Sequence, residues 1–533
     1  MTFGIDFGTT NTAVSFLNAD NEPENVKFDD AQLQHEYIPS LVVFKDKNTP
    51  QEETFWGVDA QERVGDPGHS SYRNFKMLLN EPKEVIKKFW GDADKDPGEL
   101  TGGFLSYLFK QIKKQCNIEP KKVVVTTPNI WMPDLLGQGK REILISFIKK
   151  LGAQTIEVKA EPEAAASYWL HEYKKKYKKD FSGHLLVCDC GGGTLDFSLV
   201  SIVIRNGMPE VEVLNTKSNG FVGKTLGKAG VAFDNAVVKE LFPKLQVESQ
   251  QRWNEMLEDF ERKKILKTRH ITNGLKSYRN DPTTMEGSSG LFNVGGKDVE
   301  AGTLCMAFDE YIKPGIESML QKIRAFLQSN EINEHDPETF RVVLAGGFSR
   351  FGLVEDTIKR FFGSQTSSDK RFVDIFTPQD RVFAIAKGAA LIANSLIKVI
   401  ETCPYDVGIT VHEVKNSPTG TTIVSNDRLI LNKGVEIEKY KITQWWPEKF
   451  QPIGDVGLPL FIQSDKVSRR VELADINLSS ALPADCRRVQ VGVSMDDDKS
   501  FFFHARDADN TENQKKTSLG TLLKLLPPGL YID

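Results

Sequence analysis

The chain has 533 residues, 40% of them hydrophobic, which is enough for a large core and about two to four domains. A net charge of −5 argues against nucleic acid or an acidic membrane as a partner. The opening MTFGIDFG lacks the features of a signal peptide, and the sequence has no apolar run of about 18 residues. The six cysteines include no CxxC pair, and Cys188 and Cys190 are expected to be reduced, partly buried thiols. We therefore expect a soluble, cytoplasmic protein with no membrane partner.

The first part of the chain predicts strands that end at glycine or proline. FGIDFG is a short strand, and helical or mixed polar sequence is expected up to about residue 115. KKVVVTTP (121–128) is typical of a strand buried on both faces. Residues 140–153 have helical spacing. TIEVKAEPEAAASYWL predicts a strand, a turn and a helix, with Pro162 at the first helical position.

The second part continues this alternation and then changes near residue 400. LLVCDCGGG and SLVSIVI predict strands, and residues 233–270 are mostly helical. RVVLAGGFSR (341–350) predicts a strand and a glycine turn, and residues 382–400 a long apolar helix. Beyond residue 400, period-two alternation at 434–444, 469–478 and 488–505 predicts antiparallel strands. Residues 508–518 are expected to form a polar loop or tail, and the segment has no apolar alternation.

Two segments share one pattern of apolar residue, aspartate, spacer, glycine and threonine. They are IDFGTT, residues 5–10, and VCDCGGGT, residues 187–194, and together they indicate two related halves that face each other. Glycines let backbone N–H groups approach phosphate oxygens, and threonine hydroxyls add hydrogen bonds. Carboxylates on the strands can hold Mg²⁺ through its water shell. Each segment alone is also compatible with an ordinary tight turn, so the prediction of a nucleoside triphosphate site depends on their joint occurrence.

A third glycine turn, AGGFSR at residues 345–350, follows another apolar strand. It could admit the adenosine end of the nucleotide, with the planar guanidinium of Arg350 lying on the base.

With these motifs the chain resembles the heat shock protein 70 (DnaK-type) chaperone family of the actin-like ATPase superfamily. GIDFGTTN and CDCGGGTLD resemble the two phosphate motifs of the family, and VVVTTP and AEPEAAA resemble its connecting motifs. GVAFDN resembles a short element beyond the second phosphate loop. LAGGFSR resembles the adenosine motif, and AIAKGAA resembles the helix that follows it. The resemblance implies an α/β actin-like ATPase domain, duplicated and ribonuclease H-like, over residues 1–398, with two lobes that divide near residue 180. It also implies an antiparallel β-sandwich over residues 403–533, which would bind substrate.

The resemblance implies a role for each site residue. Asp6 and Asp189 would hold hydrated Mg²⁺, Glu161 would orient the attacking water, and Lys76 would approach the γ-phosphate. Asp196 would organise the metal and a monovalent ion such as K⁺. The residues assigned to catalysis are Lys76, Glu161, Asp189 and Thr194. The residues assigned to ATP or ADP are Asp6, Gly8, Thr9, Thr10, Asn11, Gly191, Gly192, Gly193, Thr194, Asp196, Glu261, Lys264, Thr268, Gly346, Gly347, Phe348 and Arg350.

The sequence also departs from the family pattern. Ile265 stands where many members have a second base-stacking arginine, and Phe348 stands where they have a small hydroxyl residue, so a more apolar base pocket is expected. Arg141 is assigned to the relay between domains. The acidic, leucine-rich linker is not recognisable, and the helical lid is expected to be absent because the sequence ends at residue 533. The final TLLKLLPPGLYID is expected to pack on the β domain as an edge element, or alternatively to occupy the peptide groove.

Three functions remain open from the sequence. The first is a slowly ATP-hydrolysing chaperone that binds extended apolar peptide segments and works with a J-domain protein and a nucleotide exchange factor. The second is a small-molecule kinase of the actin-like fold, which would need an acid near the acceptor hydroxyl and would lack the appended β domain. The third is a nucleotide-binding scaffold that hydrolyses ATP weakly.

Overall fold

The structure is a computed structural model that describes residues 1–29, 34–131, 135–219, 228–285, 290–363, 369–372, 375–403, 406–417, 420–436, 445, 457–464, 467–473, 476–477, 488–495 and 500–521. It contains two compact units, one made of residues 1–129 and 143–399 and the other of residues 130–142 and 400–533. Most of the predicted strand at 434–444 and the leucine-rich end of the chain lie outside the described residues.

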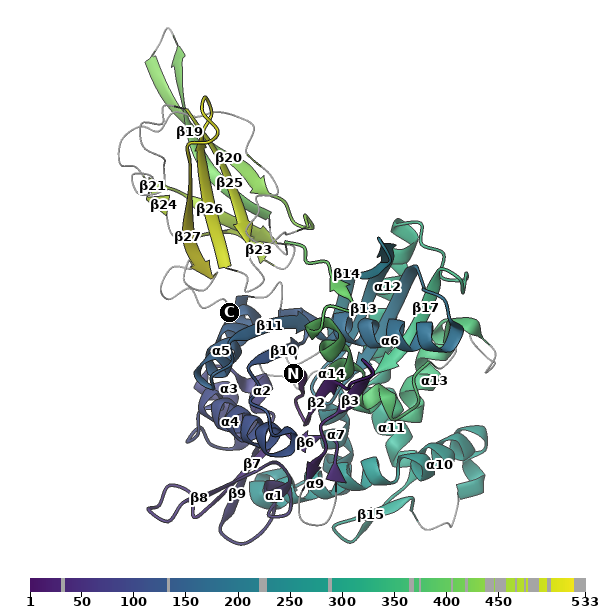
Figure 1. Cartoon of the computed structure of the whole chain (residues 1–533). Helices are drawn as coiled ribbons and strands as arrows, with labels where there is room; N and C mark the ends of the chain where they lie inside the picture. The colour runs from purple at the N-terminus through teal and green to yellow at the C-terminus, as the bar shows by residue number, and fades with distance from the viewer. Residues whose placement is uncertain are drawn as a thin grey trace. The chain divides into compact units, whose positions relative to one another are not determined.

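The first unit contains two mixed sheets with related strand patterns (Figure 1). In the first sheet, β1 (Thr2–Phe7) pairs antiparallel with β2 (Asn11–Leu17) and parallel with β10 (Lys122–Thr127). The sheet is completed by β3 (Pro23–Asn25) and β6 (Ile38–Pro39), which pair with β2, and by β11 (Thr155–Ala160), which pairs with β10. The buried valines Val123, Val124 and Val125 agree with the prediction of a doubly covered strand in β10.

The second sheet repeats this arrangement. Strand β12 (Gly183–Cys190) pairs antiparallel with β13 (Leu195–Arg205) and parallel with β17 (Phe340–Ala345). The sheet continues from β13 to β14 (Met208–Asn219) and then to β18 (Lys398–Val399). In each sheet a glycine turn joins two antiparallel strands into a hairpin, β1 with β2 and β12 with β13. The first strand of each hairpin also pairs with a parallel strand, β10 or β17. The chain therefore has the two related halves expected from its two glycine segments.

Two helices pack closely at the centre of this unit. Helix α6 (Glu161–Tyr177) packs against α14 (Asp380–Ala393), and α14 also packs on β1, β2 and β10. A Cβ atom at Gly388 would lie 1.7 Å from the backbone oxygen of Ala164, and one at Gly4 would lie 2.3 Å from the backbone nitrogen of Ala390. Small residues at these positions let the backbones approach, which sets the spacing between the helices and the first sheet.

The remaining elements of the first half surround its sheet. The strands are β4 (Phe28–Asp29), β5 (Gln34–His35), β7 (Leu41–Lys45), β8 (Glu53–Trp56) and β9 (His69–Arg73). The helices are α1 (Gly57–Gln61), α2 (Phe75–Leu78), α3 (Lys83–Trp90), α4 (Pro97–Cys116) and α5 (Leu135–Lys150), of which residues 135–142 belong to the second unit. The prediction of helical or mixed polar sequence was wrong for residues 11–73, which contain β2 to β9. Strands β3 to β9 have two to five residues, too few for their alternation to be recognised, and β2, with seven, has no strict alternation.

The second half adds helices and a small hairpin to its sheet. The helices are α7 (Gly230–Leu241), α8 (Leu245–Glu248), α9 (Gln250–Leu266), α10 (Thr268–Asn280), α11 (Ala301–Tyr311), α12 (Lys313–Ser329) and α13 (Gly352–Phe361). The hairpin consists of β15 (Phe292–Val294) and β16 (Lys297–Val299). A core rich in phenylalanine connects these helices with β12 and β13, and both Cys188 and Cys190 are fully buried in it as free thiols. Among the described residues, no helix combines the length and apolar character that a bilayer crossing requires.

The second unit consists mainly of antiparallel sheets. One contains β19 (Asp406–Ser417), β20 (Gly420–Leu431), β22 (Leu460–Ser464) and β23 (Val467–Glu472). Another contains β25 (Val489–Met495), β26 (Ser500–Asp507) and β27 (Gln514–Thr521), and a short pair is formed by β21 (Gly457–Leu458) and β24 (Ile476–Asn477). The two larger sheets share one apolar cluster, to which β25 contributes Val489, Val491, Val493 and Met495, as their alternation predicted.

Three local predictions need correction. Residues 514–521 form strand β27 and not a polar loop, because their backbone pairs with β26 although their side chains are mostly polar. Pro162 is the second residue of α6, since β11 runs directly into the helix at Glu161 without a turn. Helix α14 ends at Ala393, and the following residues include β18, which pairs with β14.

Candidate functional site

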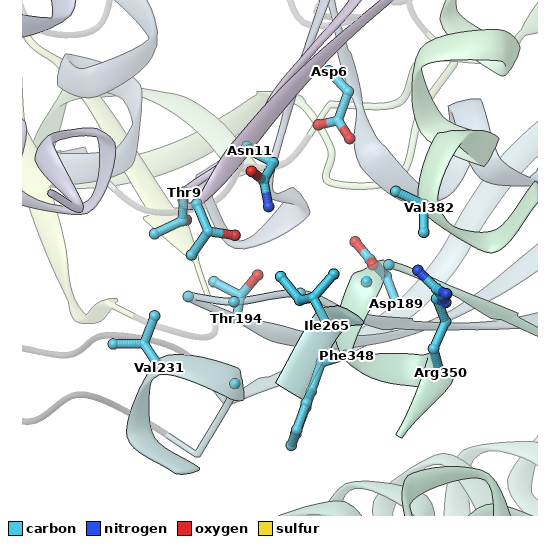
Figure 2. A pocket seen from close by; sticks show the side chains of 18 of the residues that line it. Asp6, Thr9, Asn11, Asp189, Thr194, Val231, Ile265, Phe348, Arg350 and Val382 are labelled. Atoms are coloured by element: carbon cyan, nitrogen blue, oxygen red, sulfur yellow. The ribbon is translucent and has the colours of Figure 1, made fainter. Parts of the chain in front are cut away.

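One cavity of about 160 Å³ lies between the two halves of the first unit. Figure 2 shows Asp6 and Thr9 from the first half above Asp189 and Thr194 from the second half, with Ile265, Phe348 and Arg350 beside the latter pair. The structure brings every predicted site residue except Asp196 to the lining of this cavity. Asp196 lies beside it, within reach of the carboxylates of Glu161 and Asp189.

The two glycine hairpins touch each other across the cavity. A Cβ atom at Gly192 would lie 2.6 Å from Thr10 Cγ2, and one at Gly193 would lie 2.5 Å from Thr9 Oγ1. The second hairpin is also held by α7, because the backbone N–H of Val231 donates to Gly192 O at 2.7 Å. The opposite hairpin therefore requires glycine at 192 and 193. A ligand that approached the backbone there would be a second reason for glycine.

The third glycine turn, at the end of β17, has two glycines in different situations. Gly346 has φ +79°, and a Cβ atom there would lie 2.4 Å from Asp189 Oδ1. At Gly347, a Cβ atom would meet no described protein atom within 4 Å. The protein itself requires glycine at 346, whereas the space beside Gly347 is open at a position that lines the cavity.

Four carboxyl groups gather at the hairpin end of the cavity: Asp6 on β1, Asp189 on β12, Asp196 on β13 and Glu161 at the start of α6. Burial and the charge of Glu161 raise the pKa of Asp6 to about 7, although Lys76 acts in the opposite direction. Burial raises the pKa of Asp189 well above its usual value, and the neighbouring acids add to this. Burial and Glu161 raise the pKa of Asp196 to about 6, while a hydrogen bond from Ser218 lowers it. Burial is the largest cause of all three shifts, so it favours the protonated form of each of these carboxyl groups.

The donors in this cluster match a hard divalent cation. Oxygens of Glu161, Asp189 and Asp196 lie within 4.8 Å of one another. Oδ1 of Asp189 and Oδ2 of Asp196 are buried and accept no hydrogen bond from the described residues. Buried carboxylate oxygens without partners are the ligand type that Mg²⁺ prefers. The sequence assigned the ion to Asp6 and Asp189, while the structure groups Asp189 with Glu161 and Asp196 and places Asp6 on the adjoining wall.

Lys76 is the basic side chain at this end of the cavity. It lies on α2, is buried, and its Nζ is 3.0 Å from Oε1 of Glu161. Glu161 is held in place at the β11–α6 junction, where Oε2 of Glu163 accepts the backbone N–H of Ala160. The ion pair thus joins two residues that both line the cavity.

Another part of the cavity lining comes from α9, the start of α10 and the turn at 347–350, helix η3 (Gly347–Arg350). Glu261, Lys264 and Thr268 all line the cavity, as their helical spacing predicted. However, the helix is interrupted at Lys267, and Thr268 begins α10. The Thr268 hydroxyl donates to the backbone oxygens of Lys264 and Ile265, at 3.0 and 2.7 Å, and so completes the end of α9.

Lys264 is held by a buried acid. It forms an ion pair with Asp234 of α7, and its Nζ lies 5.6 Å from the ring centroid of Phe348. Burial raises the pKa of Asp234 to about 6, and Lys264 acts against this shift. Phe348 is buried and stacks on Phe351 at 5.6 Å, so it belongs to the core as well as to the cavity wall.

An ion-pair cluster connects α9 with the first half of the unit. Arg73 of β9 pairs with Glu258 and, at 2.9 Å, with Glu261. Gln61 of α1 donates to Glu258 at 2.6 Å. Glu261 therefore reaches the cavity with its position already set by a residue from the opposite half.

The sequence analysis missed several residues that line the cavity. They include Tyr37, Pro128, Gly230, Val231, Asp234, Phe351, Val382 and Ile385. Asp234 lies in GVAFDN, a motif already noted, and membership of that motif is the sequence signal that could have found it. Tyr37 had no sequence signal, since it lies between two very short strands in a segment without a motif. Arg141, assigned to the relay, is a buried residue of α5.

Comparison with known proteins supports one family. Residues 69–404 match the family model described as Hsp70 protein. The chain is 26% identical over 362 residues to "Chaperone protein DnaK" of Mycoplasma mobile, covering 67% of this chain and 53% of the relative. It is 27% identical over 373 residues to the protein of that name from Mycoplasmopsis synoviae, covering 68% and 54%. It is 24% identical over 554 residues to the one from Stenotrophomonas maltophilia, covering 96% and 77%.

The chain thus spans about half the length of two of these relatives. The family match covers more than half of the chain and includes α6, the second glycine hairpin and the turn at 347–350. The chain belongs to the Hsp70 family.

Proposed function

We propose that this chain binds ATP with Mg²⁺ in the cavity of the first unit and hydrolyses it slowly to ADP and phosphate. The observation that carries the proposal is the position of the acid cluster beside two facing glycine hairpins, with Asp6, Glu161 and Asp189 in the lining of one cavity and Asp196 next to it. Phosphoryl transfer depends mainly on positioning and on neutralisation of charge, and this arrangement offers both. The bound nucleotide would extend from the hairpins toward α9 and Arg350.

In the proposed mechanism, the backbone of residues 8–10 and 191–194 and the hydroxyls of Thr9, Thr10 and Thr194 bind the β- and γ-phosphates. Lys76 donates toward the γ-phosphate, and its pairing with Glu161 keeps the two groups in a fixed relation. Glu161 accepts a proton of the attacking water and orients its oxygen. Asp189, Asp196 and Asp6 would hold Mg²⁺, directly or through water, and K⁺ would lie near Asp196. The ion would supply charge neutralisation at the phosphates.

We further propose that residues 1–398 form the nucleotide-binding domain and that residues 403–533 form a β-sandwich that binds extended apolar peptides. The shared cluster of the two larger sheets in the second unit supports a sandwich. Binding by main-chain hydrogen bonds with an apolar side-chain pocket would fit a chaperone whose peptide affinity depends on the bound nucleotide. A J-domain protein and a nucleotide exchange factor are proposed partners, from family membership.

Two measurements on the whole chain test this proposal. Calorimetry should detect one site for MgATP, and single-turnover assays should show slow phosphate release that Thr194→Ala reduces. Binding of a fluorescent leucine-rich peptide should then differ between MgATP and MgADP. Absence of MgATP binding by a cooperatively folded protein would contradict the nucleotide site. Equal peptide affinity in both states would contradict the coupling but not the site.

A further inference from the structure

Tyr37 is an aromatic residue of the cavity lining that neither the motifs nor the family assignments include. It follows β5 in the first half of the unit, whereas Glu261 and Arg350 come from the second half. All three residues line the same cavity. Burial raises the pKa of Tyr37, and the negative charge of Glu261 raises it further, whereas the positive charge of Arg350 lowers it. The phenol therefore lies within electrostatic range of both side chains.

The ring of Tyr37 has a firm support. Together with Val382 it packs against a small apolar cluster of Ala13 on β2 and Phe383 and Ala386 on α14, and its ring centroid lies 6.5 Å from that of Phe383. Three aromatic side chains among the described residues line the cavity: Tyr37, Phe348 and Phe351. Phe348 and Phe351 are buried and stacked on each other, whereas Tyr37 keeps part of its surface exposed. Tyr37 is thus the aromatic ring of this cavity with surface left for a ligand.

The direction of the nucleotide determines what Tyr37 can contact. The glycine hairpins and the acid cluster occupy one end of the cavity and provide groups suited to phosphates and a cation. If the phosphates lie there, the ribose and base must extend toward α9 and Arg350. Arg350 is suited to one face of a planar group, and its buried Nε has no hydrogen-bond partner among the described residues. Tyr37 lines the same cavity from the other half of the unit, so its ring would add a second contact surface for the nucleoside.

We propose that Tyr37 is a specificity-determining residue that contacts the nucleoside part of the bound nucleotide, with its ring supplying most of the contact. This inference rests on the proposed function. Aromatic rings bind planar bases and sugar faces through apolar contact and have little attraction for bare phosphate. Tyr37 should therefore help the site to distinguish a nucleoside triphosphate from an inorganic polyphosphate.

The test compares two ligands, MgATP and magnesium tripolyphosphate, by calorimetry or competition with the whole chain. Tyr37→Ala should raise the Kd for MgATP by about tenfold. The same variant should bind tripolyphosphate as the wild type does, which also shows that its phosphate end is folded. Tyr37→Phe keeps the ring and should stay within about threefold of the wild type for MgATP.

Other outcomes would overturn the proposal in distinct ways. Unchanged MgATP affinity in Tyr37→Ala would remove Tyr37 from the nucleoside contacts. A proportionate loss for both ligands would mean that Tyr37 supports the whole cavity and not the nucleoside alone. Equal losses in the Ala and Phe variants would overturn the assignment of the contact to the ring. Failure of the wild type to bind MgATP is a separate result, which would contradict the proposed function itself.

Discussion

Nζ of Lys76 lies 3.0 Å from Oε1 of Glu161, and both side chains are buried. The lysine comes from the short helix α2, and the glutamate is the first residue of α6. The pair connects α2 with the start of α6, two segments of the first half that are far apart in the sequence. They come together only when the first sheet has formed. It also places the proposed phosphate-binding and water-orienting groups in direct contact, so that a change in one must alter the other.

Removal of Lys76 should affect both stability and chemistry. Lys76→Ala leaves Glu161 as a buried charge without this partner, which should lower the free energy of unfolding by about 3 kcal/mol. Single-turnover phosphate release should fall by about 100-fold or more, because a group proposed to stabilise the transition state is lost. The double variant Lys76→Ala with Glu161→Gln should regain most of the stability but none of the hydrolysis. A double variant as unstable as the single one would contradict the ion-pair explanation.

The contact between the two hairpins predicts a size limit at Gly192. Gly192→Ala would place a methyl group against Thr10 Cγ2, push the hairpins apart and raise the Kd for MgATP by about tenfold. Thr10→Ser removes that methyl group and keeps the hydroxyl. The combination of Gly192→Ala with Thr10→Ser should therefore bind more tightly than Gly192→Ala alone, as measured by calorimetry. Thr10→Ser by itself serves as the control and should change the affinity little.

Alanine substitutions at the neighbouring glycines 346 and 347 should affect different properties, namely stability at 346 and nucleotide affinity at 347. Gly346→Ala combines a positive φ with a clash against Asp189, and it should lower the free energy of unfolding by about 1–3 kcal/mol. Gly347→Ala meets open space and should leave the thermal midpoint unchanged, while nucleotide affinity falls because the methyl group enters the proposed ligand space. If Gly347→Ala binds MgATP as the wild type does, the nucleotide does not approach the backbone there.

The acid cluster predicts a pH dependence for stability without ligand. Because the pKa of Asp196 is raised to about 6 in the folded protein, its carboxyl favours folding at low pH and loses this contribution as pH rises through about 6. The Asp196→Asn side chain cannot ionise. The free energy of unfolding of this variant, minus that of the wild type, should therefore increase by about 1–2 kcal/mol from pH 5 to pH 8. Denaturant unfolding at the two pH values measures this difference. A difference that does not change with pH would show that Asp196 has an ordinary pKa.

Much of the fold around the site could be predicted from local patterns. The strands β1, β10, β12 and β17 are apolar runs that end at glycine or proline, and such runs are recognisable because they are buried on both sides. The short strands between residues 11 and 73 and strand β27 were not predicted. Their side chains are partly polar, and their conformation depends on pairing with a neighbouring strand, which no local pattern records.

The candidate site divides in the same way. By itself the amino-acid sequence determined which residue types are available to the site, because glycines, threonines and aspartates at strand ends form motifs that occur together. Only the tertiary structure decided which of them meet: that Gly192 touches Thr10, that Asp196 joins Glu161 and Asp189, and that Asp234 holds Lys264. It also brought Tyr37 and Arg350 to the lining of one cavity. These contacts join residues far apart in the chain, and their geometry is set by the packing of two sheets and the helices between them, which a linear pattern does not contain.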